Sequence, residues 1–81
     1  MAITQGDEYR VQVARDLGAA LRHFRTQRNV TQAEAAEMEK VGQPYLSKLE
    51  SGSFGSSLNH ALRLLRLLGC EVVVRRRVGG G

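Results

Sequence analysis

The chain has 81 residues, one cysteine and a net charge of +4, from twelve lysines and arginines against eight aspartates and glutamates. A chain of this length forms one small domain and buries too little apolar surface to be comfortably stable without a partner, a disulfide or a metal. Cys70 alone excludes an internal disulfide, and His23 and His60 lack the spacing of metal ligands, so we expect no metal site and no cofactor. Oligomerisation remains as the expected source of stability.

The first residues show no basic run followed by an apolar core of signal-peptide length, and no window approaches the apolar length that crosses a membrane. We therefore expect a cytoplasmic protein without membrane contact.

The positive charge lies mostly before and after a central segment in which Glu34, Glu37 and Glu39 concentrate. This distribution is compatible with a basic rim that faces phosphates. It is also compatible with ordinary solvated helix faces, which the charge excess alone favours.

Residues 1–13 form the expected N-terminal arm. Because Tyr9, Val11 and Val13 alternate with polar residues, the segment is either extended or an additional helical turn, and Gly6 argues against a helix that reaches the terminus. A first helix then runs to about Arg28, since apolar residues recur at steps of three and four: Ala14, Leu17, Leu21 and Phe24.

Thr31 begins a second helix, because its hydroxyl and Glu34 three residues later form the pattern of a reciprocal capping box. This helix is short, since Pro44 belongs in the first turn of a following helix over residues 43–50. In the third helix Leu46 and Leu49 face the core. The exposed candidates for binding are therefore Gln43, Pro44, Ser47 and Lys48.

A fourth helix from about Leu58 to Leu68 carries more leucines than one buried stripe requires, and the residues after Gly69 read as a strand. No other strand of comparable quality is expected in the chain. We therefore predict that residues 70–78 pair with the same strand of a second copy and that residues 79–81 form a disordered tail. The predicted dimer interface consists of Leu64, Leu67, Val72, Val73 and Val74.

The segment LRHFRTQRNVTQAEAAEMEKVGQPYLSKLESG resembles the Xre or Cro/C-repressor helix-turn-helix family, and the resemblance covers about residues 14–69. Residues at the spacings of the family carry it: Arg25, Thr31, Gln32, Ala36, Ser47 and Glu50. It implies a mainly α, lambda-repressor-like domain of four to five helices, here with a C-terminal β-strand pairing across a dimer. In such proteins the arginine at Arg25 pairs with the glutamate at Glu50.

The chain departs from the family pattern at three positions. Where the family usually has a large aliphatic residue, a second apolar residue and a turn glycine, this chain has Ala35, Glu39 and Lys40. We therefore expect the second helix to pack weakly and Lys40 to adopt a left-handed conformation at a cost of about 1 kcal/mol or more.

The resemblance also implies contacts with double-stranded DNA. Gln32 would hold a phosphate at the start of the second helix, and Gln43 would bond bidentately to adenine at the start of the third. Lys48 would donate to guanine or phosphate, and Ser47 would contact base or backbone. For Tyr45, contact with a thymine methyl and a packing or interface role are equally compatible with its position. The remaining expected DNA contacts are Arg28, Thr31, Pro44, Ser51 and Ser53.

The C-terminal stretch LLRLLGCEVVVRRR is similar to that of HipB-type antitoxins. That similarity implies a homodimer that represses its own operon at a palindromic operator and binds a HipA-like kinase toxin. The alternative is a stand-alone Xre-family regulator without a toxin. Arg75, Arg76 and Arg77 would touch a toxin or DNA phosphates, or would only keep an edge strand soluble. We expect no enzymatic activity, because no serine, cysteine or histidine has a partner at catalytic spacing.

Overall fold

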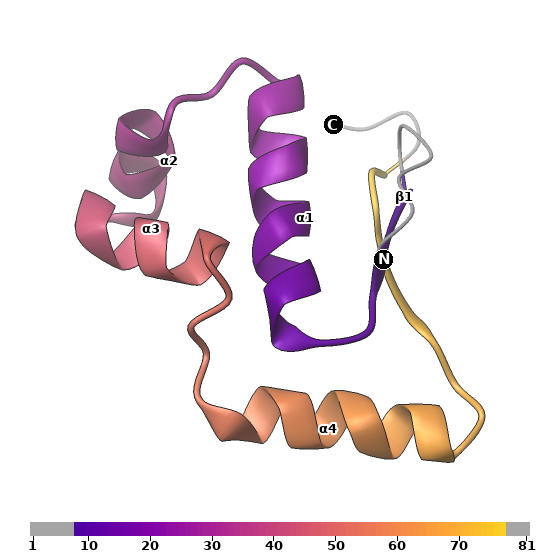
Figure 1. Cartoon of the computed structure of the whole chain (residues 1–81). Helices are drawn as coiled ribbons and strands as arrows, with labels where there is room; N and C mark the ends of the chain where they lie inside the picture. The colour runs from indigo at the N-terminus through magenta and orange to yellow at the C-terminus, as the bar shows by residue number, and fades with distance from the viewer. Residues whose placement is uncertain (1–7, 78–81) are drawn as a thin grey trace.

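The computed structural model describes residues 8–77, which form four helices and two short strands. The order is β1 (Glu8–Val11), α1 (Ala14–Gln27), α2 (Gln32–Glu39), α3 (Gln43–Glu50), α4 (Ser56–Leu67) and β2 (Val72–Arg75). Helix α1 stands in the middle, with α2 and α3 on one side, the sheet on the other, and α4 crossing near the start of α1 (Figure 1). The expected mainly α class with a small C-terminal β element is confirmed.

Strand β2 pairs with β1 of its own chain, so the expectation that the chain offers β2 no partner is wrong. The two strands are antiparallel, in a register that sets Tyr9 opposite Val74 and Val11 opposite Val72. Two ion pairs flank this ladder, Arg10 with Glu71 at 3.0 Å and Arg75 with Glu8 at 3.2 Å. The sequence allowed the segment before α1 to be either extended or helical. Its described part is extended, and it forms the strand that pairs with β2.

This pairing involves the three valines of the predicted dimer interface. Val72, Val73 and Val74 are half-buried in a sheet within one chain, and their role in a dimer stays a prediction. The predicted disordered tail at residues 79–81 and most of the predicted arm, residues 1–7, lie outside the described residues.

Helix α1 begins at Ala14 because several polar groups occupy its free backbone donors. The carboxylate of Asp16 accepts from the backbone N–H of Gln12 at 2.8 Å and from that of Val13 at 3.2 Å. Asn59 of α4 accepts from the backbone N–H of Ala14 at 2.8 Å, which ties α4 to the start of α1. At the other end Asn29 has a φ of +57°, a conformation that asparagine tolerates and that stops the helix where the sequence indicates.

The core of the described residues is small and made largely of small side chains. Its buried apolar members are Val11, Ala14, Ala20, Ala36, Leu46 and Leu62, and no large side chain is fully buried. Of the leucines in α4 only Leu62 is buried and Leu58 half-buried, although the sequence predicts at least one full buried stripe. No helix among residues 8–77 is long and apolar enough to cross a membrane.

Candidate nucleic-acid interface

The second helix starts with the reciprocal capping box that the sequence predicts. The hydroxyl of Thr31 accepts from the backbone N–H of Glu34 at 3.1 Å, and the carboxylate of Glu34 accepts from the backbone N–H of Thr31 at 2.8 Å. The hydrogen bond that the Thr31 backbone N–H donates to the carboxylate lowers the pKa of Glu34, and the Thr31 side chain adds to the lowering. Because both donors are satisfied, α2 begins at a fixed residue and its first turn keeps a defined orientation.

The turn between α2 and α3 passes through Lys40 in the left-handed region, with φ +63° and ψ +45°. Its backbone N–H and that of Val41 close the end of α2, the latter by donating to Ala36 at 2.9 Å. Gly42 precedes α3 in an extended conformation, and Pro44 occupies the first turn of that helix. The bounds predicted for the third helix, residues 43–50, and the left-handed Lys40 are both confirmed.

A buried ion pair connects α1 to the end of α3. Arg25 Nε lies 2.5 Å from Glu50 Oε2 and its Nη2 lies 3.0 Å from Glu50 Oε1, while its Nη1 donates to the carbonyl of Val30 at 2.7 Å. The side chains of Arg25 and Glu50 are 11% and 4% exposed. This is the pair that the family resemblance implies. It holds α1, α3 and the loop that leads into α2 in one arrangement.

The Arg25 hydrogen bonds lower the pKa of Glu50, and although burial acts in the opposite direction, a further hydrogen bond from Gln32 assists the lowering. The same contact with Glu50 raises the pKa of Arg25. The carboxylate is therefore ionised at neutral pH and is available as an acceptor for a second partner.

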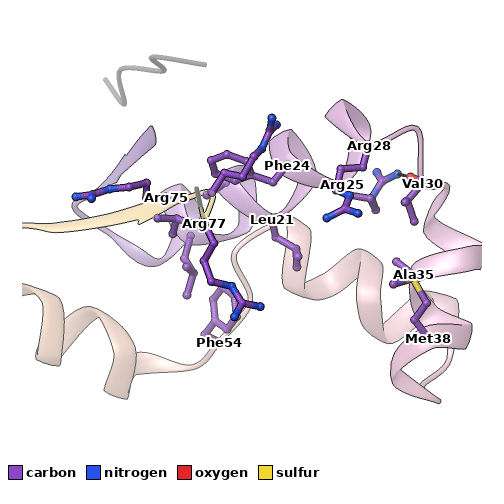
Figure 2. Close-up of a pocket in the computed structure, with 14 residues that line it drawn as sticks. Leu21, Phe24, Arg25, Arg28, Val30, Ala35, Met38, Phe54, Arg75 and Arg77 are labelled. Carbon is purple, nitrogen blue, oxygen red and sulfur yellow. Dashed lines mark hydrogen bonds between the residues drawn. The ribbon is translucent and has the colours of Figure 1, made fainter. Parts of the chain in front are cut away.

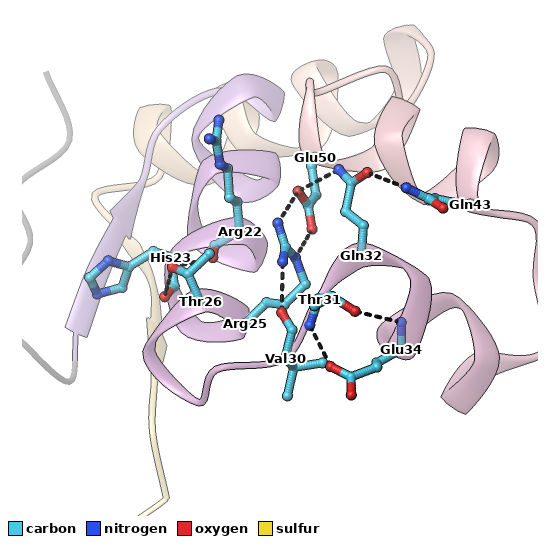
Figure 3. Close-up of polar contacts among 10 residues, drawn as sticks. All are labelled: Arg22, His23, Arg25, Thr26, Val30, Thr31, Gln32, Glu34, Gln43 and Glu50. Carbon is cyan, nitrogen blue, oxygen red and sulfur yellow. Dashed lines mark hydrogen bonds and ion pairs between the residues drawn. The ribbon is translucent and has the colours of Figure 1, made fainter.

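That second partner is Gln32, and through it the network reaches the start of α3 (Figure 3). Gln32 Nε2 donates to Glu50 Oε1 at 3.1 Å, and Gln32 Oε1 accepts from Gln43 Nε2 at 3.3 Å. An amide nitrogen carries two hydrogens. Gln43 thus keeps one N–H and its carbonyl oxygen, the two groups that bond bidentately to adenine, and Gln32 keeps one N–H for a phosphate.

The outer side of α3 is exposed and matches the reading side that the sequence predicts. Leu46 is buried and Leu49 half-buried, whereas the other members of the set are exposed: Gln43, Pro44, Tyr45, Ser47 and Lys48. Tyr45 is 55% exposed, which favours a binding role over packing within the chain. A short, exposed helix with polar side chains fits the major groove of DNA in size and chemistry.

The expected phosphate contacts lie in two places. Thr31, Ser51 and Ser53 are exposed at the ends of α2 and α3, where the Ser51 hydroxyl already donates to the carbonyl of Lys48 at 2.8 Å. Arg28 lies instead at the end of α1, on the rim of an apolar groove that no α3 residue lines. The structure therefore does not group Arg28 with the exposed side of α3.

Gly18 is a positioning residue that the sequence alone does not reveal. A Cβ atom at this position would lie 2.5 Å from the carbonyl oxygen of Leu49 and 2.6 Å from that of Glu50. Only a glycine permits so close an approach of α1 to the end of α3. The feature of the sequence that could have indicated this contact is a glycine inside an otherwise regular helical pattern, which sometimes marks close packing.

Among residues 8–77 no three histidine, cysteine or acidic side chains converge as a metal site. His23 lies against Tyr9 and Phe24, with ring centroids 5.5 Å and 4.8 Å away, and is half-buried.

Comparisons with known proteins agree with this geometry. A family model described as a helix-turn-helix domain matches residues 16–78. A protein of Sinorhizobium fredii named as an uncharacterized HTH-type transcriptional regulator, y4mF, is 32% identical over 63 residues, which are 78% of this chain and 83% of that protein. No solved structure was found to match the chain. The chain belongs to the helix-turn-helix family of DNA-binding transcriptional regulators.

Proposed function

We propose that this protein is a sequence-specific repressor that inserts α3 into the major groove of a palindromic operator as a homodimer. The observation that carries the proposal is the chain of hydrogen bonds from Arg25 through Glu50 and Gln32 to Gln43. It fixes the amide of Gln43 at the start of an exposed helix, with the acceptor and donor for adenine left over.

The other side chains of α3 complete the reading surface. Lys48 donates to guanine or to a phosphate, Ser47 contacts a base or the backbone, and Pro44 and Tyr45 offer apolar contact to a thymine methyl. Backbone contacts come from Thr31, Gln32, Ser51 and Ser53, with Arg28 as a more distant phosphate contact. DNA binding of this kind places the protein on the bacterial nucleoid.

A homodimer is favoured by the exposure of the α4 leucines. Leu64 is 57% exposed and Leu67 is 72% exposed in a chain whose core contains no fully buried large side chain. Covering apolar surface of this kind is a usual source of stability for so small a domain. A two-fold dimer presents two copies of α3, which matches an operator with two half-sites.

The direct test is a Gln43→Ala/Lys48→Ala double variant, measured against an operator selected from a random-sequence DNA pool. We expect it to lose specific binding, with affinity falling to that of unrelated DNA, while its helical circular dichroism is unchanged. The matched control is Arg63→Ala, which removes one positive charge from the exposed face of α4 and should keep specific recognition. Operator binding by the double variant at wild-type affinity would refute the role given to α3.

We propose further that the protein acts as the antitoxin of a HipA-like kinase toxin and represses its own operon. The support is the resemblance of the α4 and β2 sequence to HipB-type antitoxins, together with exposed arginines at Arg75, Arg76 and Arg77. The second candidate is a stand-alone regulator without a toxin, and the name of the Sinorhizobium relative, an HTH-type transcriptional regulator, is compatible with both candidates.

The two candidates differ in a binding partner. In the native host, affinity purification should recover a kinase-like protein, and the Gln43→Ala/Lys48→Ala variant should still neutralise its toxicity, because toxin binding does not use α3. Absence of such a protein under conditions that express the whole operon would leave the stand-alone regulator.

A further inference from the structure

An open apolar groove of about 850 Å³ runs along α1, on a part of the molecule that the reading surface does not use (Figure 2). Its floor comes from α1, including Leu21 and Phe24, and its walls from Met38 of α2, Phe54 of the loop before α4, and the end of β2. Met38 is 75% exposed. An apolar groove of this size is unfavourable when water covers it, so we expect an apolar segment to bind there.

The chain itself displays an apolar element that is equally uncovered. The last turn of α4 and the residue after it present four leucines that are exposed by 57%, 37%, 72% and 68%: Leu64, Leu65, Leu67 and Leu68. The two surfaces have matching chemistry, an apolar hollow and an apolar helix end. Both occur once in every copy of the chain, so the match can be made twice in a two-fold pair.

The match is one of apolar surfaces and not of charge. The groove has arginines on its rim, among them Arg28 and Arg77, and the last turn of α4 carries Arg66. The backbone carbonyl groups of the last turn already accept hydrogen bonds from the backbone N–H groups of residues 68–70. Burial of the leucines is therefore the contribution that would hold the contact.

The α4 helix of the same chain is held away from this groove. Asn59 binds the backbone of Ala14 at 2.8 Å, and Arg66 donates to the carbonyl of Gln12, so both contacts anchor α4 at the start of α1. Beyond the helix, pairing of β2 with β1 fixes the other end of the connection. A helix tied at both ends cannot reach the groove without breaking these contacts.

We infer that the groove along α1 receives the leucine-bearing end of α4 from a second copy of this chain, and that the exchange is reciprocal. The resulting dimer is closed, and it leaves α3 uncovered, because no α3 residue lines the groove. The inference rests on the homodimer of the proposed function and replaces strand pairing as the way that the two copies meet.

A cross-linking experiment on the full chain directly tests whether the end of α4 binds in the groove of a second copy. In a Cys70→Ser background, Met38→Cys and Leu67→Cys place one thiol on the groove wall and one on the helix end. A short bifunctional maleimide should convert this double variant into a covalent dimer. The matched control, Tyr45→Cys with Leu67→Cys, places the first thiol on exposed α3, outside the groove, and should stay monomeric under denaturing electrophoresis.

The outcomes separate the alternatives. A cross-link within one chain would show that α4 of the same chain fills the groove, and it would overturn the inference, as would the lack of any cross-link specific to Met38→Cys. If the wild-type chain sediments as a monomer at micromolar concentration, the homodimer fails as well. If it sediments as a dimer but the cross-link fails, only the proposed binding of α4 in the groove is wrong.

A second measurement uses the exposed leucines. Leu67→Glu with Leu68→Glu should weaken the dimer by at least about 100-fold in sedimentation equilibrium, since burying each leucine contributes roughly a factor of ten or more. Both side chains are exposed within one chain, so the variant should keep its helical circular dichroism. The charge-matched control is His60→Glu with Ala61→Glu, also exposed on α4, which should remain dimeric. An unchanged dimer in the leucine variant would overturn the inference.

Discussion

The α1–α3 half of the molecule and its α4–β2 half are held in different ways. In the first, α3 is fixed by a buried ion pair, a shared carboxylate and a backbone contact at Gly18 that leaves no space for a side chain. In the second, α4 is tied through a part-buried hydrogen bond at Asn59 and an exposed one at Arg66, while most of its leucines remain in water. The contacts of one chain therefore suffice to position α3, whereas in the proposed dimer the apolar surface of the other half is covered by a second copy.

The largest effect on stability is expected from removal of the Glu50 carboxylate, which accepts hydrogen bonds from both Arg25 and Gln32. Glu50→Ala leaves the Arg25 guanidinium buried without its partner, and we expect the free energy of unfolding to fall by about 3–5 kcal/mol, measured by urea denaturation. The comparison is Glu71→Ala, because the Arg10–Glu71 pair is 46% and 67% exposed and should be worth at most about 1 kcal/mol. Equal losses in the two variants would contradict the assigned difference.

Gly18→Ala tests the close approach of α1 and α3. The added methyl group would lie 2.5 Å from a backbone oxygen, so the helices must separate, and we expect a net loss of about 1–3 kcal/mol in thermal unfolding despite the better helix propensity of alanine. The control is Gly42→Ala, where the nearest atom is 3.7 Å away and the loss should stay below about 1 kcal/mol. A stabilised Gly18→Ala variant would show that the contact is loose.

Acid should weaken the first half through the same carboxylate, by less than its deletion because the protonated group keeps its shape. The pKa of Glu50 is lower in the folded chain than its unfolded value of about 4.3. Its contribution is therefore complete above that value and is lost as pH falls through the folded pKa. Denaturation between pH 7 and pH 3 should show a steeper decline for the wild type than for Glu50→Gln. Parallel curves would remove Glu50 as the cause.

The smallest expected effect concerns the turn. Lys40→Gly removes the cost of the left-handed conformation, about 1–2 kcal/mol, but adds freedom to the unfolded chain, so the net gain in unfolding free energy should be about 0.5–1 kcal/mol. Lys40→Ala removes the same charge and keeps the Cβ atom, and it should give no gain. Thermal denaturation of the pair measures the difference, and a gain from alanine would point to charge instead of backbone strain.

Local signals in the sequence predicted the first half well. The capping box at Thr31, the third helix over residues 43–50 and the left-handed Lys40 each depend on a few neighbouring residues, and all three occur in the structure. The ion pair of Arg25 and Glu50 came from family resemblance, since nothing in the spacing of two residues 25 positions apart reveals that they meet.

The parts that sequence reasoning missed depend on distant contacts. Strand β1 is four residues long, and its alternation of apolar and polar residues is too short to identify a strand by itself. It becomes a strand because residues more than 60 positions later pair with it. For Gln32 the sequence predicts a phosphate contact but not the hydrogen bond to Glu50, because that bond depends on where the end of α3 lies in space. The start of α4 at Ser56, two residues before the predicted Leu58, shows the usual imprecision of a helix start without a side-chain cap.

The hydrogen bond between Gln32 and Gln43 has a consequence for how operator preference can change during evolution. Gln43 is oriented by a residue that also binds the carboxylate at the centre of the fold, so substitutions there disturb a network shared with stability. Ser47 and Lys48 stand one helical turn further along, exposed and outside that network. In the proposed binding mode, new binding preferences are therefore reached at lower cost by changing these two positions, while Gln43 keeps its orientation at the start of α3.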